Sequence, residues 1–303
     1  MKKSFGAWLY GAQDEFLQEI KDYNDAVRPE RQVRYLYPHI GKMYFPSPAE
    51  PKVPAPIFHA ERLNFYVQYC QNHPSLELQV HPMIDGSIKD AGKNSPKPVY
   101  VEQLAESLAE KLRPFLGKIH GLHLDIEPVL PGHEYMYQIF KKRVAEYCNL
   151  PLSIAVGRRQ NLSSVCSLVD MAVLMLYDCG EHGEPTPLAP EIYAKRARAR
   201  LAHFREYTDQ AGCYTSVGLP AAVTGHEYEG EVGSPPSRRM DDYLRSIWHD
   251  VLSFLETPKS TGITLWNIRN KKEFPKKEIN GKKGTLLFPA TIEKAVCNFI
   301  QTH

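Results

Sequence analysis

The feature that most constrains the fold is an alternation of short strand-like runs and longer amphipathic stretches along the chain. The short runs are rich in β-branched and aromatic residues, and this alternation is typical of βαβ units with parallel strands. Eight strands are predicted, at residues 5–10, 32–38, 76–82, 121–127, 152–157, 170–178, 213–220 and 262–268. Eight such units favour a closed (β/α)8 barrel, in which reacting groups sit at the carboxyl ends of the strands.

The stretches between these runs carry apolar residues at three- and four-residue spacing, the pattern of amphipathic helices. They lie at residues 15–27, 61–73, 101–116, 135–148, 191–210 and 239–257, and a further helical pattern begins at Ala290. A barrel of this kind accounts for the 303 residues as a single catalytic domain over 1–303. A doubly wound open sheet is the alternative, but no GxGxxG motif follows the first strand.

Charge and hydropathy argue against several classes of partner. The chain has 37 basic and 35 acidic residues, a net charge of +2 that gives no overall field for nucleic acid or an anionic membrane. The lysine-rich segment 271–283 is interpreted as a solvated face. No apolar run reaches the roughly 18 residues of a membrane span. Without a convincing signal peptide or a CxxC pair, we expect a cytoplasmic protein with reduced thiols, or a secreted one if a leader has been removed.

The fourth predicted strand, GLHLDIE at 121–127, places two carboxylates among apolar residues. Alternation along a strand separates its side chains into two faces. The face expected to pack under the helices consists of Leu122, Leu124 and Ile126. The face expected to point into the barrel, with the last residue nearest the mouth, consists of His123, Asp125 and Glu127. Two carboxylates buried together raise at least one pKa, an arrangement that suits a general acid.

Aromatic residues are predicted to join these acids at the mouth. In the sixth strand, alternation aims Met175 and Tyr177 to the same side, so a phenol stands at the late end of the strand. Trp266 occupies a similar late position in the eighth strand, where an indole suits the apolar face of a sugar ring. The joint appearance of acids, phenol and indole at strand ends favours a carbohydrate-active site.

These residues resemble glycoside hydrolase family 18, the chitinases and endo-β-N-acetylglucosaminidases, whose fourth strand carries D-x-x-D-x-D-x-E. The corresponding stretch, HGLHLDIE at 120–127, matches the last two acids. The family's sixth-strand M-x-Y-D is similar to MLYD at 175–178, and its seventh-strand G-x-P is similar to GLP at 218–220. Its eighth-strand tryptophan is similar to Trp266. The resemblance spans the chain in order, through short motifs.

The resemblance implies substrate-assisted, retaining hydrolysis of β-linked N-acetylhexosamine glycans, without a metal ion or cofactor. Glu127 would protonate the glycosidic oxygen, while Asp125 would orient the N-acetyl group whose carbonyl oxygen attacks the anomeric carbon. Tyr177 would hydrogen-bond that oxygen, and Asp178 would help hold the sugar. The other expected substrate contacts are Trp266, Met175, His123 and Trp8. An oligosaccharide or polysaccharide is thus the expected partner.

The sequence also departs from the family pattern. His120 and His123 stand where the family has its first two aspartates, and the third strand lacks S-x-G-G. A cationic His123 beneath Asp125 would hold that carboxylate ionised and lower its pKa. A catalytically inactive, carbohydrate-binding relative is therefore an alternative function.

Two further enzyme classes are compatible with the same barrel. A metal-dependent isomerase or hydrolase would bind a divalent ion with donors drawn from His39, His81, His123, Asp125 and Glu127. A two-carboxylate glycosidase would need a nucleophile near the end of the seventh strand. The nearest candidates for that nucleophile, several residues late, are Glu227 and Glu229.

Overall fold

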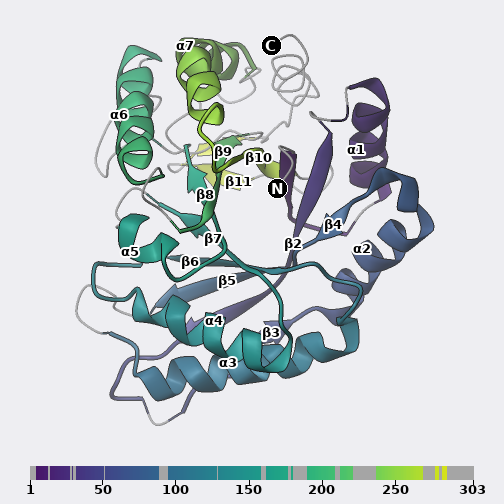
Figure 1. Cartoon of the computed structure of the whole chain (residues 1–303), viewed down its shortest axis with the longest axis vertical. Coiled ribbons are helices and arrows are strands. Elements are labelled where there is room, and N and C mark those ends of the chain that lie inside the picture. Colours follow the sequence, from purple (N-terminus) through teal and green to yellow (C-terminus); the bar gives the residue numbers. More distant parts are fainter. Residues whose placement is uncertain are drawn as a thin grey trace.

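The computed structural model shows a closed barrel of parallel strands with helices around its outside (Figure 1). It describes residues 5–12, 14–27, 29, 32–50, 52–88, 95–127, 129–157, 162–176, 179, 190–208, 212–220, 237–268, 277–279 and 282–284. The barrel strands are β1 (Phe5–Leu9), β2 (Val33–Phe45), β5 (Met83–Ile88), β6 (Leu122–Glu127), β7 (Leu152–Val156), β8 (Met171–Met175), β9 (Tyr214–Pro220) and β10 (Ser260–Ile268). Because β1 pairs in parallel with both β2 and β10, the sheet closes, which confirms the predicted (β/α)8 fold.

Helices follow the barrel strands in the order that the apolar spacing predicts. They are α1 (Asp14–Ala26), α2 (Ala60–Asn72), α3 (Pro98–Leu112), α4 (Tyr135–Tyr147), α5 (Leu162–Cys166), α6 (Pro190–Thr208) and α7 (Ser237–Leu255). All but the short α5 match predicted helices to within a few residues. Within the described part of the chain, no helix is both long and apolar enough to cross a membrane. The pattern at Ala290 lies outside the described residues, so one domain over 1–303 stays a prediction.

Two predicted strands had wrong boundaries, and prolines explain both errors. The third barrel strand was predicted at 76–82, but only β4 (Gln79–Val80) forms there, and the main strand β5 begins after Pro82. The second was predicted to end at Pro38, yet β2 continues to Phe45. Pro38 is tolerated within β2 because it lies where β1 ends, opposite Leu9. Past that point β2 pairs instead with the antiparallel β3 (Ile57–Phe58).

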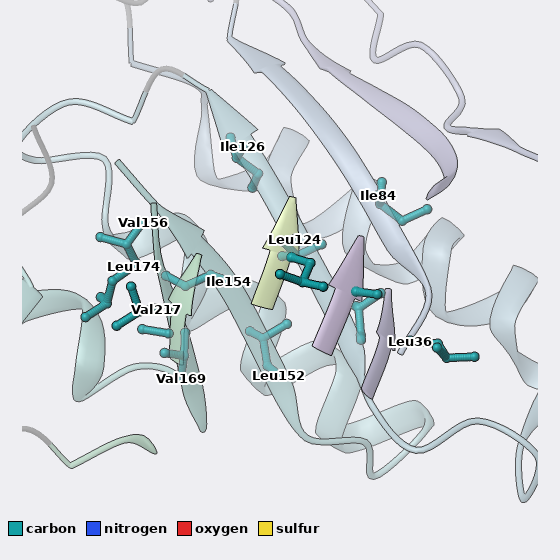
Figure 2. Close-up of a cluster of buried hydrophobic side chains, with 14 of the residues drawn as sticks. Leu36, Ile84, Leu124, Ile126, Leu152, Ile154, Val156, Val169, Leu174 and Val217 are labelled. Carbon is teal, nitrogen blue, oxygen red and sulfur yellow. The ribbon is translucent and has the colours of Figure 1, made fainter. Parts of the chain in front are cut away.

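The main hydrophobic core lies between the outer faces of the strands and the helices. Leu122, Leu124 and Ile126 are fully buried in it, which confirms the predicted apolar face of the fourth barrel strand. Figure 2 shows part of this core, where Ile84 and Ile154 extend from the strands on either side of β6. Burying each aliphatic side chain contributes about 1.5–3 kcal/mol, so this layer fixes which face of β6 points inward.

A second, smaller cluster fills the inside of the barrel. Its buried members are Trp8, Tyr35, Tyr37, Met83, Ala155, Met171, Val173 and Met175. Barrels of this size have packed interiors rather than pores, so any site lies above this filling, at the carboxyl ends of the strands. The cluster is therefore the floor of the candidate site.

The described cysteines carry free thiols. Cys166, Cys179 and Cys213 are buried, and burial raises the pKa of Cys70 to about 11. Cys297 lies outside the described residues. The lysine-rich segment contains a short antiparallel hairpin of β11 (Lys277–Ile279) and β12 (Lys282–Gly284).

Candidate active site

The register of three neighbouring strands, β2, β5 and β6, aligns their inward-facing residues in rows that rise toward the mouth. A register shift between His39 and Gly41 keeps the following residues of β2 in step with the inward-facing residues of β5. The lowest row is His39, Met83 and His123. The middle row is Lys42, Asp85 and Asp125. The top row is Tyr44, Ser87 and Glu127.

Glu127 occupies the position at the mouth that alternation along the strand predicts. It is the last residue of β6, and its residue surface is exposed. A Cβ atom added to Gly157, just after β7, would lie 3.9 Å from Glu127 Oε1 and 3.3 Å from Met175 Cε. The absence of a side chain at position 157 therefore leaves space beside the carboxyl group, between β6 and β8. A proton donor at this place can reach a ligand that enters the mouth.

Asp125 lies one step below Glu127 on the same face, and its charge is disfavoured. Burial raises the pKa of Asp125 well above its ordinary value, and the carboxylates of Glu127 and Asp85 raise it further. Its Oδ1 atom is buried and has no hydrogen-bond partner among the described residues. A carboxyl group in this setting holds its proton to higher pH and keeps an acceptor oxygen available to a ligand.

His123 lies beneath Asp125 as a neutral imidazole, which corrects the cationic form considered from the sequence. The indole Nε1–H of Trp8 donates to His123 Nε2 over 3.0 Å, so that nitrogen is an acceptor and the proton resides on Nδ1. Nδ1 lies 2.9 Å from Ser153 Oγ, and Ser153 Oγ donates to the Leu122 carbonyl. Burial, assisted by His81, lowers the pKa of His123 to about 3. His123 therefore does not hold Asp125 ionised.

The other predicted substrate contacts are distributed between the floor and residues outside the description. Trp8 is 1% exposed and its N–H binds His123, so it supports the floor. Met175 is also buried, but its methyl group lies beside the space next to Glu127. Trp266 belongs to β10 and pairs in register with Pro220 of β9, while its side chain lies outside the described part. Tyr177 and Asp178 lie outside the described residues, as do Glu227 and Glu229.

Asp85 and its contact with His39 were not predicted from the sequence. Asp85 Oδ2 lies 3.1 Å from His39 Nε2, and the Tyr10 ring stacks on the His39 ring with centroids 5.5 Å apart. A strand correctly placed at 83–88 would have aimed Asp85 and Ser87 inward by alternation. Because the third strand was predicted at the wrong residues, Asp85 was not recognised as an inward-facing acid in the same row as Asp125.

Tyr44 is a second residue that sequence reasoning missed. Its side chain is at the mouth end of β2, 41% exposed, with Lys42 Nζ 5.2 Å from its ring centroid. It shares the top row with Ser87 and Glu127. An exposed aromatic ring two strands from the acid is the kind of platform on which a sugar ring stacks.

The donors of the metal alternative do not converge. Among the described residues, which include all five candidate donors, no group of three or more His, Cys, Asp or Glu side chains is placed to hold a metal ion. His81 was expected at the mouth, but it precedes β5 and lies at the opposite end of the barrel, against the rings of Tyr35 and Tyr37. Burial and the neighbouring His120 lower the pKa of His81 to about 3. His81 thus supports the base of the barrel.

Comparisons with known proteins support the architecture. No family model and no curated protein matches the sequence. Solved structures that it resembles include the GH113 β-mannanase AaManA from Alicyclobacillus acidocaldarius, with a TM-score of 0.62, 13% identity, and coverage of 99% of this chain and 96% of that chain. A chitinase from Ipomoea carnea has a TM-score of 0.57 and 14% identity, with coverage of 98% of this chain and 99% of that chain. A xylanase-A-amylase inhibitor protein, XAIP-III, has a TM-score of 0.53 and 15% identity, with coverage of 98% of both chains. At these identities the likeness shows the fold alone: this chain has the (β/α)8 barrel that glycoside hydrolases and an inhibitor protein share.

Proposed function

We propose that this protein is a glycoside hydrolase that cleaves β-linked N-acetylhexosamine glycans with Glu127 as the acid/base. The proposal rests on two carboxyl groups on the inward face of β6. Glu127 is exposed at the mouth, and Asp125 lies directly below it with a raised pKa. Catalytic acids of glycosidases depend on such paired carboxyl groups at the end of a barrel strand. The similarity in fold to a chitinase agrees with this assignment.

The geometry suits a mechanism in which the substrate supplies its own nucleophile. Glu127 protonates the departing glycosidic oxygen as the acetamido oxygen attacks the anomeric carbon. The buried Oδ1 of Asp125, which has no partner among the described residues, accepts the acetamido N–H and so orients the attacking group. Glu127 then takes a proton from the water that opens the cyclic intermediate. The packed floor below keeps other water away from that intermediate.

Three residues complete the proposal through the family 18 resemblance. Tyr177 hydrogen-bonds the acetamido oxygen, Asp178 holds the sugar, and Trp266 stacks beneath it. The catalytic domain is proposed to comprise the whole of residues 1–303. The glycan is chitin-like or belongs to the N-glycan core, because both offer β-linked N-acetylglucosamine.

The experiment is turnover of fluorogenic N-acetylglucosaminides and chitooligosaccharides by the wild type and Glu127→Gln. We expect kcat/KM to fall at least about 100-fold, the scale of losing a positioned proton donor, with unchanged circular dichroism. Glu61→Gln, the same chemical change on the exposed first turn of α2, is the matched control and should retain full activity. Equal activity of wild type and Glu127→Gln would reject the assignment.

A two-carboxylate glycosidase is the second candidate, favoured by the similarity in fold to a β-mannanase. That mechanism requires a nucleophilic carboxylate after β9, where Glu227 and Glu229 follow in the sequence. Parallel assays with β-1,4-mannooligosaccharides and chitooligosaccharides separate the candidates. Cleavage of mannooligosaccharides alone, lost in Glu227→Gln or Glu229→Gln, would replace the first proposal with this one.

A sugar-binding protein without catalysis is the third candidate, because the same fold occurs in an inhibitor protein. Isothermal titration with chitooligosaccharides, followed by chromatography of the recovered sugar, tests it. Binding with the sugar recovered intact would establish this function in place of hydrolysis.

A further inference from the structure

We propose that Asp85, held by His39, is a positioning residue: its carboxyl group lies beside Asp125 in the sheet and helps to disfavour a charge on Asp125. The catalytic consequence of this pairing rests on the proposed glycosidase function. The pairing itself is a property of the barrel mouth, and it can be measured on the protein without substrate.

The sheet register brings the two carboxyl groups together. Asp85 of β5 and Asp125 of β6 are directly paired in the parallel ladder, and both belong to the inward face. Neighbouring strands lie about 4.8 Å apart, so side chains paired across them interact directly. Each residue has an Oδ1 atom that is buried and without a hydrogen-bond partner in the described part of the chain. Two such acids cannot both carry a full charge without cost.

His39 gives Asp85 a partner on the side away from Asp125. The Asp85 Oδ2 to His39 Nε2 distance is 3.1 Å, and both side chains are partly exposed. Tyr10 of the β1 end stacks on the imidazole at an interplanar angle of 24°, which fixes the ring against Asp85. Lys42, opposite Asp85 in the β2–β5 ladder, adds a positive group on the same side. Both residues lie on β2, on the far side of Asp85 from Asp125.

Among the described residues, the neighbours of Asp125 on β5, β6 and β7 supply carboxyl groups and no cation. Glu127 lies above it on β6 and Asp85 beside it on β5, and both raise its pKa in addition to burial. His123 beneath it is neutral, with both ring nitrogens in hydrogen-bond contact with Trp8 and Ser153. On the β7 side the residues facing the interior are small and do not titrate: Ser153, Ala155 and Gly157.

This arrangement offers a reason for the unusual histidines of the fourth strand. Position 120, before β6, and position 123, within it, hold histidines where the family 18 motif has aspartates, so neither position provides a carboxylate below Asp125. Asp85 provides that carboxylate from the neighbouring strand instead. In a glycosidase, neutral Asp125 then presents an acceptor oxygen to the acetamido N–H without adding a second full charge below Glu127.

The test is a titration of side-chain carboxyl carbons by 13C NMR on the full chain labelled at aspartate, with the Asp125 resonance assigned from Asp125→Asn. In the wild type we expect the Asp125 midpoint above the ordinary value of about 3.9. In the isosteric Asp85→Asn it should move down by about one pH unit or more, the usual effect of removing an adjacent like charge. Asp25→Asn, on the exposed side of α1, should leave it unchanged.

An Asp125 midpoint that is the same in Asp85→Asn and wild type would overturn the proposal, as would an ordinary midpoint in the wild type. The pH profile of kcat/KM gives a second readout that a purely structural role would not change. Its alkaline limb should move to lower pH in Asp85→Asn and stay in place in Asp25→Asn. If the wild type cleaves no N-acetylglucosamine oligomer, the glycosidase function fails, while the NMR titration still decides whether Asp85 controls Asp125.

Discussion

Inside the barrel, His81 and His123 are neutral imidazoles packed against aromatic rings, whereas at the mouth Asp125 lies beside the carboxyl groups of Asp85 and Glu127. Burial lowers the pKa of His81 and His123 to about 3, and it raises the pKa of Asp125. The physical cause is the same, because low-dielectric surroundings disfavour whichever form is charged. His81 and His123 are therefore uncharged supports inside the barrel, and Asp125 is an acid at the mouth that keeps its proton.

The largest expected effect is a loss of folding stability at acid pH, caused by the buried histidines. The pKa of His81 and of His123 is about 3 in the folded protein, so the unfolded chain, with ordinary histidines near 6.5, binds more protons between these values. Stability should therefore fall as the pH drops from about 6.5 to about 3, by the order of a few kcal/mol for each histidine. Asp125 has the opposite effect. Because its pKa is raised in the folded protein, its contribution to stability is lost as the pH rises through that pKa.

Urea unfolding across this pH range measures the acid effect. His81→Met should reduce the pH slope, because a thioether takes up no proton. His249→Gln on the exposed side of α7 is the control and should leave the slope as in the wild type. A slope that is identical in all three proteins would show that His81 does not titrate as its burial requires.

The second contrast concerns stability at neutral pH. His123→Leu removes the acceptor of the Trp8 N–H and the partner of Ser153, both inside the barrel. We expect a loss of about 3 kcal/mol in the free energy of unfolding, the scale of disrupting buried hydrogen bonds. Asp85→Asn at the partly exposed mouth should cost less than about 1 kcal/mol. Equal losses in the two variants would mean that the base and the mouth do not differ in their structural roles.

The smallest expected effect is on sugar binding, through Tyr44 at the rim of the barrel mouth. Tyr44→Ala should weaken chitooligosaccharide binding by about three- to tenfold, the range of one aromatic platform, with kcat nearly unchanged. Tyr214, 39% exposed at the amino end of β9, provides the control at the opposite end of the barrel. Titration calorimetry on both alanine variants measures this difference. Similar affinities for the two variants would exclude Tyr44 as a sugar platform.

The fold was predictable because its signals are local. Alternation in LHLDIE separates the faces of β6 correctly, and the apolar spacing of the long helices survives in the structure. The errors lie at Pro38 and Pro82, where a proline was read as a strand end although pairing partners change at those points. Such changes depend on where other strands end, which the local sequence does not contain.

The site was predictable only in part, for the same reason. Glu127 and Asp125 follow from one strand, but the pairing of Asp85 with Asp125 needs the register between two strands. The tautomer of His123 depends on Trp8, 115 residues away in the chain. Short motifs therefore identified the acids, while their protonation states come from contacts across the barrel.

We propose that the carboxyl pair at the end of β6 acts on a glycosidic bond. A crystal structure of Glu127→Gln soaked with chitotetraose tests it most directly. We expect the sugar across the barrel mouth, with a glycosidic oxygen within about 3 Å of the side chain at position 127 and an acetamido group against Asp125. Sugar bound elsewhere on the barrel, or absent from the mouth at saturating concentration, would contradict the account.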